Sequence, residues 1–155
     1  MMNEPQHFYR RSAIQGASPI GLLLILYDAL SGDLRRAAKA IRERNIEARC
    51  DALNHAALIL GQLEDWVGNH TDARLKESLV LFYAHLRARM MEAAVKQSAE
   101  LLDAQIELVL MVRTSWQQRE AASLENAGLS RHAVSADKDE TSAGPVPGGR
   151  LSQSA

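Results

Sequence analysis

Apolar residues recur at alternating intervals of three and four between about residue 18 and residue 121, and this spacing constrains the fold most strongly. It is the period of an amphipathic α-helix, in which residues three or four apart share one face. This helical period prevails over the apolar/polar alternation of a half-buried strand, and no Asn-Gly turn joins two candidate strands. The spacing therefore predicts an all-α domain.

Residues that favour helix ends divide this region into four predicted helices. Ser18 can cap the first helix, and Pro19 suits its first position because proline has no N–H to leave unpaired. Asn45, which tolerates left-handed and capping geometry, marks the end of that helix near Arg44 and the start of the second.

Two further boundaries follow from the same reasoning. Gly68 is expected to end the second helix, and Thr71 or Asp72 to cap the third. Ser98 is expected to cap the fourth helix. Helices of similar length joined by short turns must run antiparallel to their neighbours, which predicts an up-and-down four-helix bundle.

Each predicted helix carries one apolar stripe that we assign to the core. The stripes consist of Leu23, Tyr27, Leu30, Leu34, Ala37 and Ile41; Leu53, Ala56, Leu60, Leu63 and Val67; Leu75, Leu79, Phe82, Leu86, Met90 and Ala93; and Leu102, Ile106, Val109 and Trp116. A second series on the third helix widens its apolar face, and this series consists of Val80, Tyr83, Met91 and Ala94.

Three segments of different composition organise the chain. Residues 1–17 show no sustained period and are expected to form an extended N-terminal segment, whereas residues 18–121 form the bundle. Residues 122–155 are rich in Ser, Ala, Gly and Pro and offer little apolar surface to compensate for the entropy lost on ordering. We therefore predict a disordered C-terminal tail.

Charge and hydropathy exclude several classes of protein. The formal net charge is -1, without a block of like charges, so the chain lacks the basic surface of a protein that binds nucleic acid or anionic membranes. The apolar run at residues 22–26 is far shorter than the roughly 20 residues needed to cross a bilayer. The N-terminus has no apolar core of signal-peptide length, which predicts a cytoplasmic protein. Cys50 is the single cysteine and cannot form an intramolecular disulfide.

Catalytic and metal-binding patterns are weak. Glu4 and His7 form the one Glu-x-x-His pair, and a proline separates them outside the predicted bundle. Asp51 and His55 lie four residues apart without a second such pair, so we expect a surface hydrogen bond between them. The chain has no Gly-rich phosphate loop and no Gly-x-Ser-x-Gly elbow. The sequence thus predicts no enzyme, metal or cofactor, and a metal- or cofactor-binding bundle stays open as the alternative.

The apolar residues exceed what one bundle core requires. A helix uses a stripe of roughly 100° for its core, but residues 22–27 and 79–91 are apolar over more of the circumference. Tight packing between long helices is one explanation, and a groove that accepts helices of another chain is the other. A homodimer interface would leave the same apolar signature, and a helical regulator that sequesters a different partner also stays open.

Several short motifs resemble a known family. They are Tyr9, the Gly16-Ala17-Ser18-Pro19 helix start, Leu26-Tyr27-Asp28, the aromatic pair Phe82-Tyr83, Glu92-Ala93 and Trp116. Together they are similar to the flagellar secretion chaperone FliS. The resemblance implies a cytoplasmic chaperone that binds the C-terminal segment of flagellin, prevents premature polymerisation and delivers it to the flagellar type III export gate.

The resemblance also implies where the client binds. The N-terminal segment, with Tyr9 and Ile14, would cover part of a groove until the client displaces it. Candidates for lining the groove, each of which could equally belong to the core, are Leu24, Tyr27, Leu53, Leu60, Val80, Tyr83 and Met91. For Tyr27, which lies on a predicted core stripe, we favour the core.

Overall fold

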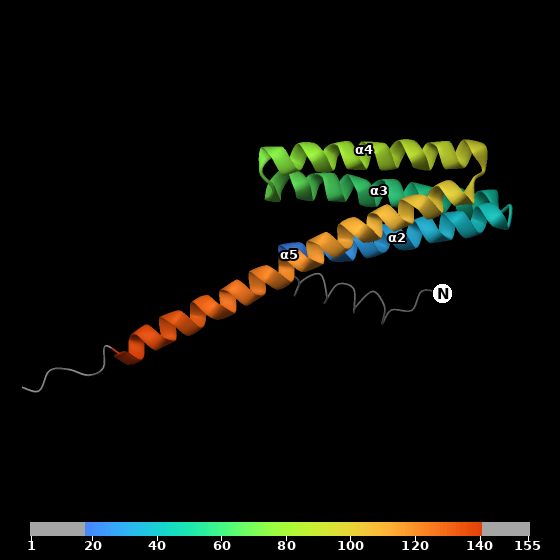
Figure 1. Ribbon diagram of the computed structural model, residues 1–155. Helices are drawn as coiled ribbons and strands as arrows, with labels where there is room; N and C mark the ends of the chain where they lie inside the picture. Colours follow the sequence, from blue (N-terminus) through green and yellow to red (C-terminus); the bar gives the residue numbers. More distant parts are fainter. Residues whose placement is uncertain (1–17, 141–155) are drawn as a thin grey trace, which may run out of the picture. The chain divides into compact units, whose positions relative to one another are not determined.

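The computed structural model describes the backbone of residues 18–140 and the burial of residues 18–135. Over this range the chain forms helices α2 (Pro19–Arg42), α3 (Ile46–His70), α4 (Ala73–Lys96) and α5 (Ala99–Glu140), shown in Figure 1. The chain divides into two compact units, of which the first ends at Glu120 and the second begins at Ala121. The predicted all-α four-helix bundle is confirmed.

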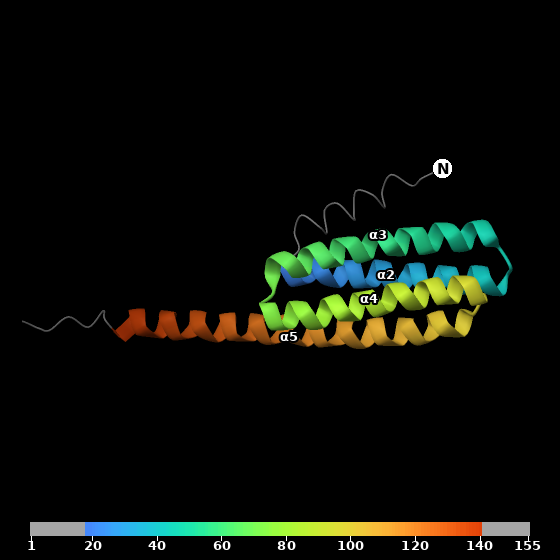
Figure 2. The same cartoon turned by 90° about the horizontal axis from the view of Figure 1, so that it is seen from above.

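Short turns make successive helices of the first unit antiparallel, and Figures 1 and 2 both show α2 beside α3 and α3 beside α4. Ion pairs join α2 to α5, which are distant in sequence, and α3 to α4, which are consecutive. On α5, Arg113 donates from Nε to Asp28 Oδ1 of α2 at 2.6 Å, while on α4, Arg87 donates from Nε to Glu64 Oε1 of α3 at 3.1 Å. The bundle is therefore closed on two sides by charge-assisted hydrogen bonds.

Four side chains cap the helix N-termini as predicted. In each case a side-chain oxygen accepts a hydrogen bond from the backbone N–H three residues later, over 2.9 to 3.3 Å. The capping residues are Ser18, Asn45, Asp72 and Ser98. These bonds satisfy N–H groups that have no partner within the helix.

Two helix ends differ from the prediction. Helix α3 continues past Gly68 to His70, because the Thr71 hydroxyl donates to the Val67 carbonyl at 2.7 Å and so satisfies an otherwise unpaired carbonyl of the last turn. At the end of α2, Arg44 adopts the left-handed conformation, with φ of 55°. Asn45 cannot do so because its extended backbone is required for capping α3.

The core contains the predicted stripes with few exceptions. Leu53, Leu75 and Phe82 are half-buried and pack against the edge of the core, whereas the other predicted core residues are buried. Helices α2 and α3 approach one another most closely. Buried alanines allow this approach because small side chains shorten the distance between helix axes, and they are Ala37, Ala40, Ala52 and Ala56.

The second unit differs from the predicted disorder, which was expected from residue 122 onward. Helix α5 extends to Glu140, and every side chain from 121 to 135 is exposed. This stretch contains Ala, Leu and Glu, which favour helix, and the prolines lie beyond it at 145 and 147. Residues 1–17 and 141–155 lie outside the described residues.

In the part of the chain that the structure describes, no helix combines the length with the hydropathy that a bilayer crossing requires.

Candidate functional site

Helix α4 presents a second apolar face on the side opposite its core residues. Its exposed fractions reach 66% for Leu81, 72% for Met91 and 83% for Val95. The positions recur every three or four residues, so the side chains share one side of the helix. We call this set the α4 apolar face, and it consists of Val80, Leu81, Ala84, Ala88, Met91 and Val95, all exposed. Contiguous exposed apolar surface of this kind is typical of a site that binds another protein.

A groove between α3 and α4 adjoins this face and shares Met91 with it. The α3–α4 groove has a volume of about 370 Å³ and is lined by Arg49, Cys50, Leu53, Asn54, Ala57, Arg87, Met90, Met91 and Ala94. One turn further along α3, a Cβ atom added to Gly61 would meet nothing within 4 Å. Small residues thus leave room above α3 for a ligand to approach the helix backbone.

Charged residues beside the α4 apolar face are paired within the chain. Arg87 reaches across the groove to Glu64, and Glu92 accepts hydrogen bonds from Lys96 at 2.7 Å and from Arg89 at 2.5 Å. The ammonium of Lys96, and next the guanidinium of Arg89, hold the pKa of the Glu92 carboxyl below its usual value. Because these charges are compensated locally, an apolar partner would not leave them unpaired.

Three predicted contact residues lie in this region. Leu53 and Met91 line the α3–α4 groove, and Val80 belongs to the α4 apolar face with 42% of its surface exposed. Leu24 lies on α2, where it is half-buried and packs against the core. Tyr9 and Ile14 lie outside the described residues.

The structure assigns three other candidates to the core instead. Tyr27, Leu60 and Tyr83 have 0% exposed surface, so a partner on the surface of this fold cannot contact them. The hydroxyls of Tyr27 and Tyr83 lie 2.7 Å apart and form a hydrogen bond between α2 and α4. Burial raises the pKa of both tyrosines, since a phenolate would lose its hydration there. In this structure the two tyrosines therefore join α2 and α4 inside the bundle.

Sequence reasoning missed four of the six residues of the α4 apolar face. Leu81, Ala84, Ala88 and Val95 were not assigned to any site, although the four-residue steps from Val80 to Ala84 and Ala88 are visible in the sequence. The signal was an uncharged helix side that persists for four turns. It was weak because alanine occurs as readily on solvated helix surfaces as in cores.

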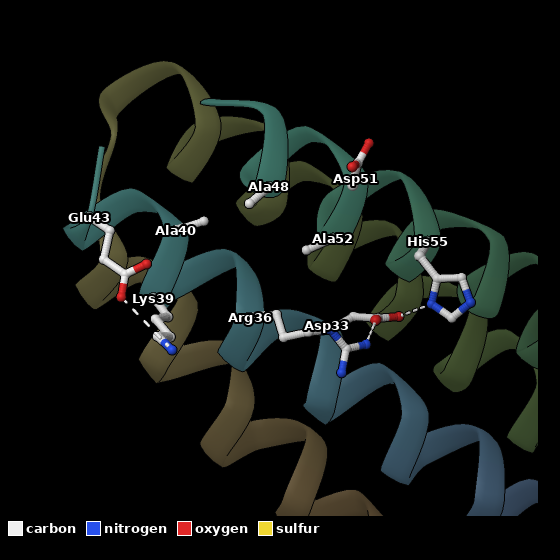
Figure 3. Close-up of a pocket in the computed structure, with 9 residues that line it drawn as sticks. All are labelled: Asp33, Arg36, Lys39, Ala40, Glu43, Ala48, Asp51, Ala52 and His55. Atoms are coloured by element: carbon white, nitrogen blue, oxygen red, sulfur yellow. Dashed lines mark hydrogen bonds and ion pairs between the residues drawn. The ribbon is translucent and has the colours of Figure 1, made fainter. Parts of the chain in front are cut away.

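A polar pocket lies between α2 and α3, and Figure 3 shows its residues. The Asp33 side chain is only 1% exposed, yet it accepts hydrogen bonds from Arg36 and, at 2.5 Å, from Nδ1 of His55. The predicted Asp51–His55 hydrogen bond is therefore wrong, because His55 points toward α2 and pairs with Asp33. Among the described residues no group of three or more potential ligands is placed to hold a metal ion. The hydrogen bond between Asp33 and His55 in this pocket thus links α2 to α3.

The family described as Flagellar protein FliS matches residues 1–123. Among curated proteins, no sequence matches the chain.

Proposed function

The chain belongs to the FliS family of flagellar proteins, and we propose that it is a cytoplasmic chaperone that binds the C-terminal segment of flagellin. In this role it prevents premature polymerisation and delivers the client to the flagellar type III export gate. Family membership supports the coarser part of this proposal, a flagellar export chaperone that is not an enzyme. Flagellin and the export gate are the partners we propose.

The observation that carries the proposal is the α4 apolar face together with the α3–α4 groove. An amphipathic helix can lay its own apolar side into such a groove. The end of a flagellin subunit assembles through apolar helical surface, so it must be masked before export. A segment that folds on binding would bury on the order of 1,000 to 3,000 Å² and lose about 2–5 kcal/mol of the gain to ordering.

We propose Leu53, Val80, Leu81, Met91 and Val95 as contacts of the client. All are apolar. Leu53 is half-buried in the groove, and the other four are exposed on the α4 apolar face. Met91 is the most informative of them, because it belongs to both surfaces and its flexible side chain adapts to varied ligands.

A matched pair of methionines tests this assignment. Met91 is 72% exposed on α4, and Met111 is 61% exposed on α5. We expect Met91→Glu to weaken binding of a flagellin C-terminal peptide at least about tenfold, or 1.4 kcal/mol, because a carboxylate would be buried against apolar surface. Met111→Glu introduces the same charge away from the groove and should bind like the unchanged protein.

Calorimetry and size-exclusion chromatography measure both variants. A one-to-one complex with the unchanged protein and a selective loss in Met91→Glu would support the proposal. Absence of association at tens of micromolar, or equal affinity of both variants, would contradict it. Stoichiometric bound metal or a visible chromophore in the purified protein would favour the metal- or cofactor-binding alternative.

The N-terminal segment and the free state complete the proposal. We propose that Tyr9 and Ile14 cover part of the groove before the client binds, and that Leu24 on α2 extends the contact. Removing residues 1–14 should leave the bundle folded but change client affinity, whereas loss of helicity would contradict a cap. A homodimer of the free protein would bury the same apolar face, and sedimentation with and without the peptide would detect its dissociation.

A further inference from the structure

A small basic pocket lies at one end of the bundle, where the α2–α3 turn approaches the end of α4. Its volume is about 300 Å³, and its lining consists of Ala40, Ile41, Arg44, Asn45, Ile46, Arg49 and Gln97. Both non-glycine residues with left-handed backbone in the described range, Arg44 and Gln97, belong to this lining. The two turns thus bring two arginines and two side-chain amides together, without any carboxylate in the lining.

The two arginines differ from most others in the bundle because no described carboxylate forms an ion pair with them. Arg36, Arg42, Arg87, Arg89 and Arg113 each form an ion pair with Asp or Glu. Arg44 and Arg49 form no ion pair with any described residue, and the buried Nε of Arg49 has no hydrogen-bond acceptor there. Buried donors in native proteins are nearly always paired, so this N–H group is available to donate to an acceptor of a ligand.

Arg49 connects this pocket to the proposed binding site. It lines the basic pocket and also the α3–α4 groove. The groove follows α3 and α4 and reaches the basic pocket near Cys50 and Ala94. A chain that lies in the groove and terminates where the groove meets the basic pocket would therefore place its terminus beside Arg49.

We propose that the basic pocket binds the free C-terminal carboxylate of the client that occupies the groove. The proposal rests on the function proposed above. A client segment taken from the C-terminus of a protein always carries this carboxylate, whatever its side chains are. Arginine forks bind carboxylates through paired, charge-assisted hydrogen bonds. Asn45 can add its amide N–H groups, because its Oδ1 already accepts the cap bond from Ala48.

This arrangement determines the direction of the client. Helix α4 ends at the pocket and α3 begins there. A segment whose C-terminus is bound at Arg49 must therefore run parallel to α4 and antiparallel to α3. The carboxylate subsite thus fixes the direction in which the client lies in the groove.

Two forms of one peptide test the inference, the flagellin C-terminal peptide with a free carboxylate and the same peptide with a C-terminal amide. With the unchanged protein we expect amidation to weaken binding about tenfold in calorimetry, because it removes the acceptor charge. The double variant Arg44→Ala/Arg49→Ala should bind both peptides equally, at the lower affinity. Arg74→Ala, which removes an exposed arginine near the start of α4, is the matched control and should retain the preference for the free acid.

The outcomes separate this inference from the proposed function. If the unchanged protein binds both peptides equally well, the carboxylate subsite is refuted and the proposed function stands. If the arginine variant still prefers the free acid, the carboxylate lies elsewhere and the assignment to this pocket is refuted. If neither peptide binds the unchanged protein, the proposed function fails and the inference fails with it.

Discussion

Replacing Tyr83 by phenylalanine should destabilise the bundle without weakening client binding. The hydroxyls of Tyr27 and Tyr83 lie 2.7 Å apart, and both side chains have 0% exposed surface. Phenylalanine retains each ring and removes only the oxygen. In Tyr83→Phe the Tyr27 hydroxyl stays buried and loses this hydrogen bond, and Tyr27→Phe has the reciprocal effect.

The expected magnitude follows from the burial of the hydroxyl that remains. A buried polar group that has lost its partner costs about 1–3 kcal/mol, whereas removing both partners can be nearly neutral. Each single variant should therefore lose about 1–3 kcal/mol of unfolding free energy. The double variant should lose less than the sum of the two, by about 1 kcal/mol or more.

Urea unfolding followed by circular dichroism measures these differences. With a slope of about 2 kcal/mol/M, each single substitution should lower the midpoint by about 0.5–1.5 M. Calorimetry with the flagellin peptide should give unchanged affinity for the folded variants, because the hydroxyl pair lies beneath the surface.

The same pair predicts a pH dependence. Burial raises the pKa of both tyrosines above the ordinary value of 10.0. Their contribution to stability is therefore complete below pH 10, and it decreases at higher pH because the unfolded chain releases these protons and the folded chain retains them. The unfolding midpoint should fall above pH 10, and it should fall less in the double phenylalanine variant.

Two results would refute this reasoning. Additive losses in the double variant would show that the two hydroxyls do not depend on each other. If Tyr83→Phe is stable but binds the peptide more weakly, Tyr83 contacts the client, as the sequence suggested.

Three further predictions concern other parts of the chain. Asp33→Ala removes the buried acceptor of Arg36 and His55 and should lower the unfolding free energy by about 1–3 kcal/mol, and a variant as stable as the unchanged protein would contradict a linking role. Gly61→Ala should raise the unfolding free energy by about 0.5–1 kcal/mol, because the added Cβ meets no atom within 4 Å, and a loss in urea unfolding would oppose this. Deleting residues 123–155 should change the melting temperature by less than about 2 °C, because the side chains of 121–135 are exposed, and a larger decrease in a thermal scan would show that the tail stabilises the bundle.

The helices and their N-terminal ends could be predicted from the sequence because both depend on local interactions. Ser18, Asn45, Asp72 and Ser98 each cap a helix through a bond to a residue three positions later. The Gly68 prediction failed for a related reason. The terminal carbonyls of α3 are satisfied by the side chains of His70 and Thr71, so the glycine is not needed to end the helix.

Contacts between helices could not be predicted in the same way. The sequence favoured Asp51 as the partner of His55 because both lie on one helix, whereas the structure pairs His55 with Asp33 on α2. Tyr83 was grouped with Val80 and Met91, yet only Tyr83 points into the core. These outcomes depend on how far each helix is rotated about its axis, and packing against the neighbouring helices determines that rotation.

The sequence by itself therefore determined the all-α class, the helices, their caps and most of the core, since each depends on residues that are close along the chain. Only the tertiary structure decided which apolar residues face outward. Met90 and Met91 are adjacent and chemically identical, but one is 5% exposed and the other 72%. Successive residues of a helix point about 100° apart, so the orientation of α4 in the bundle buries the first methionine and leaves the second exposed.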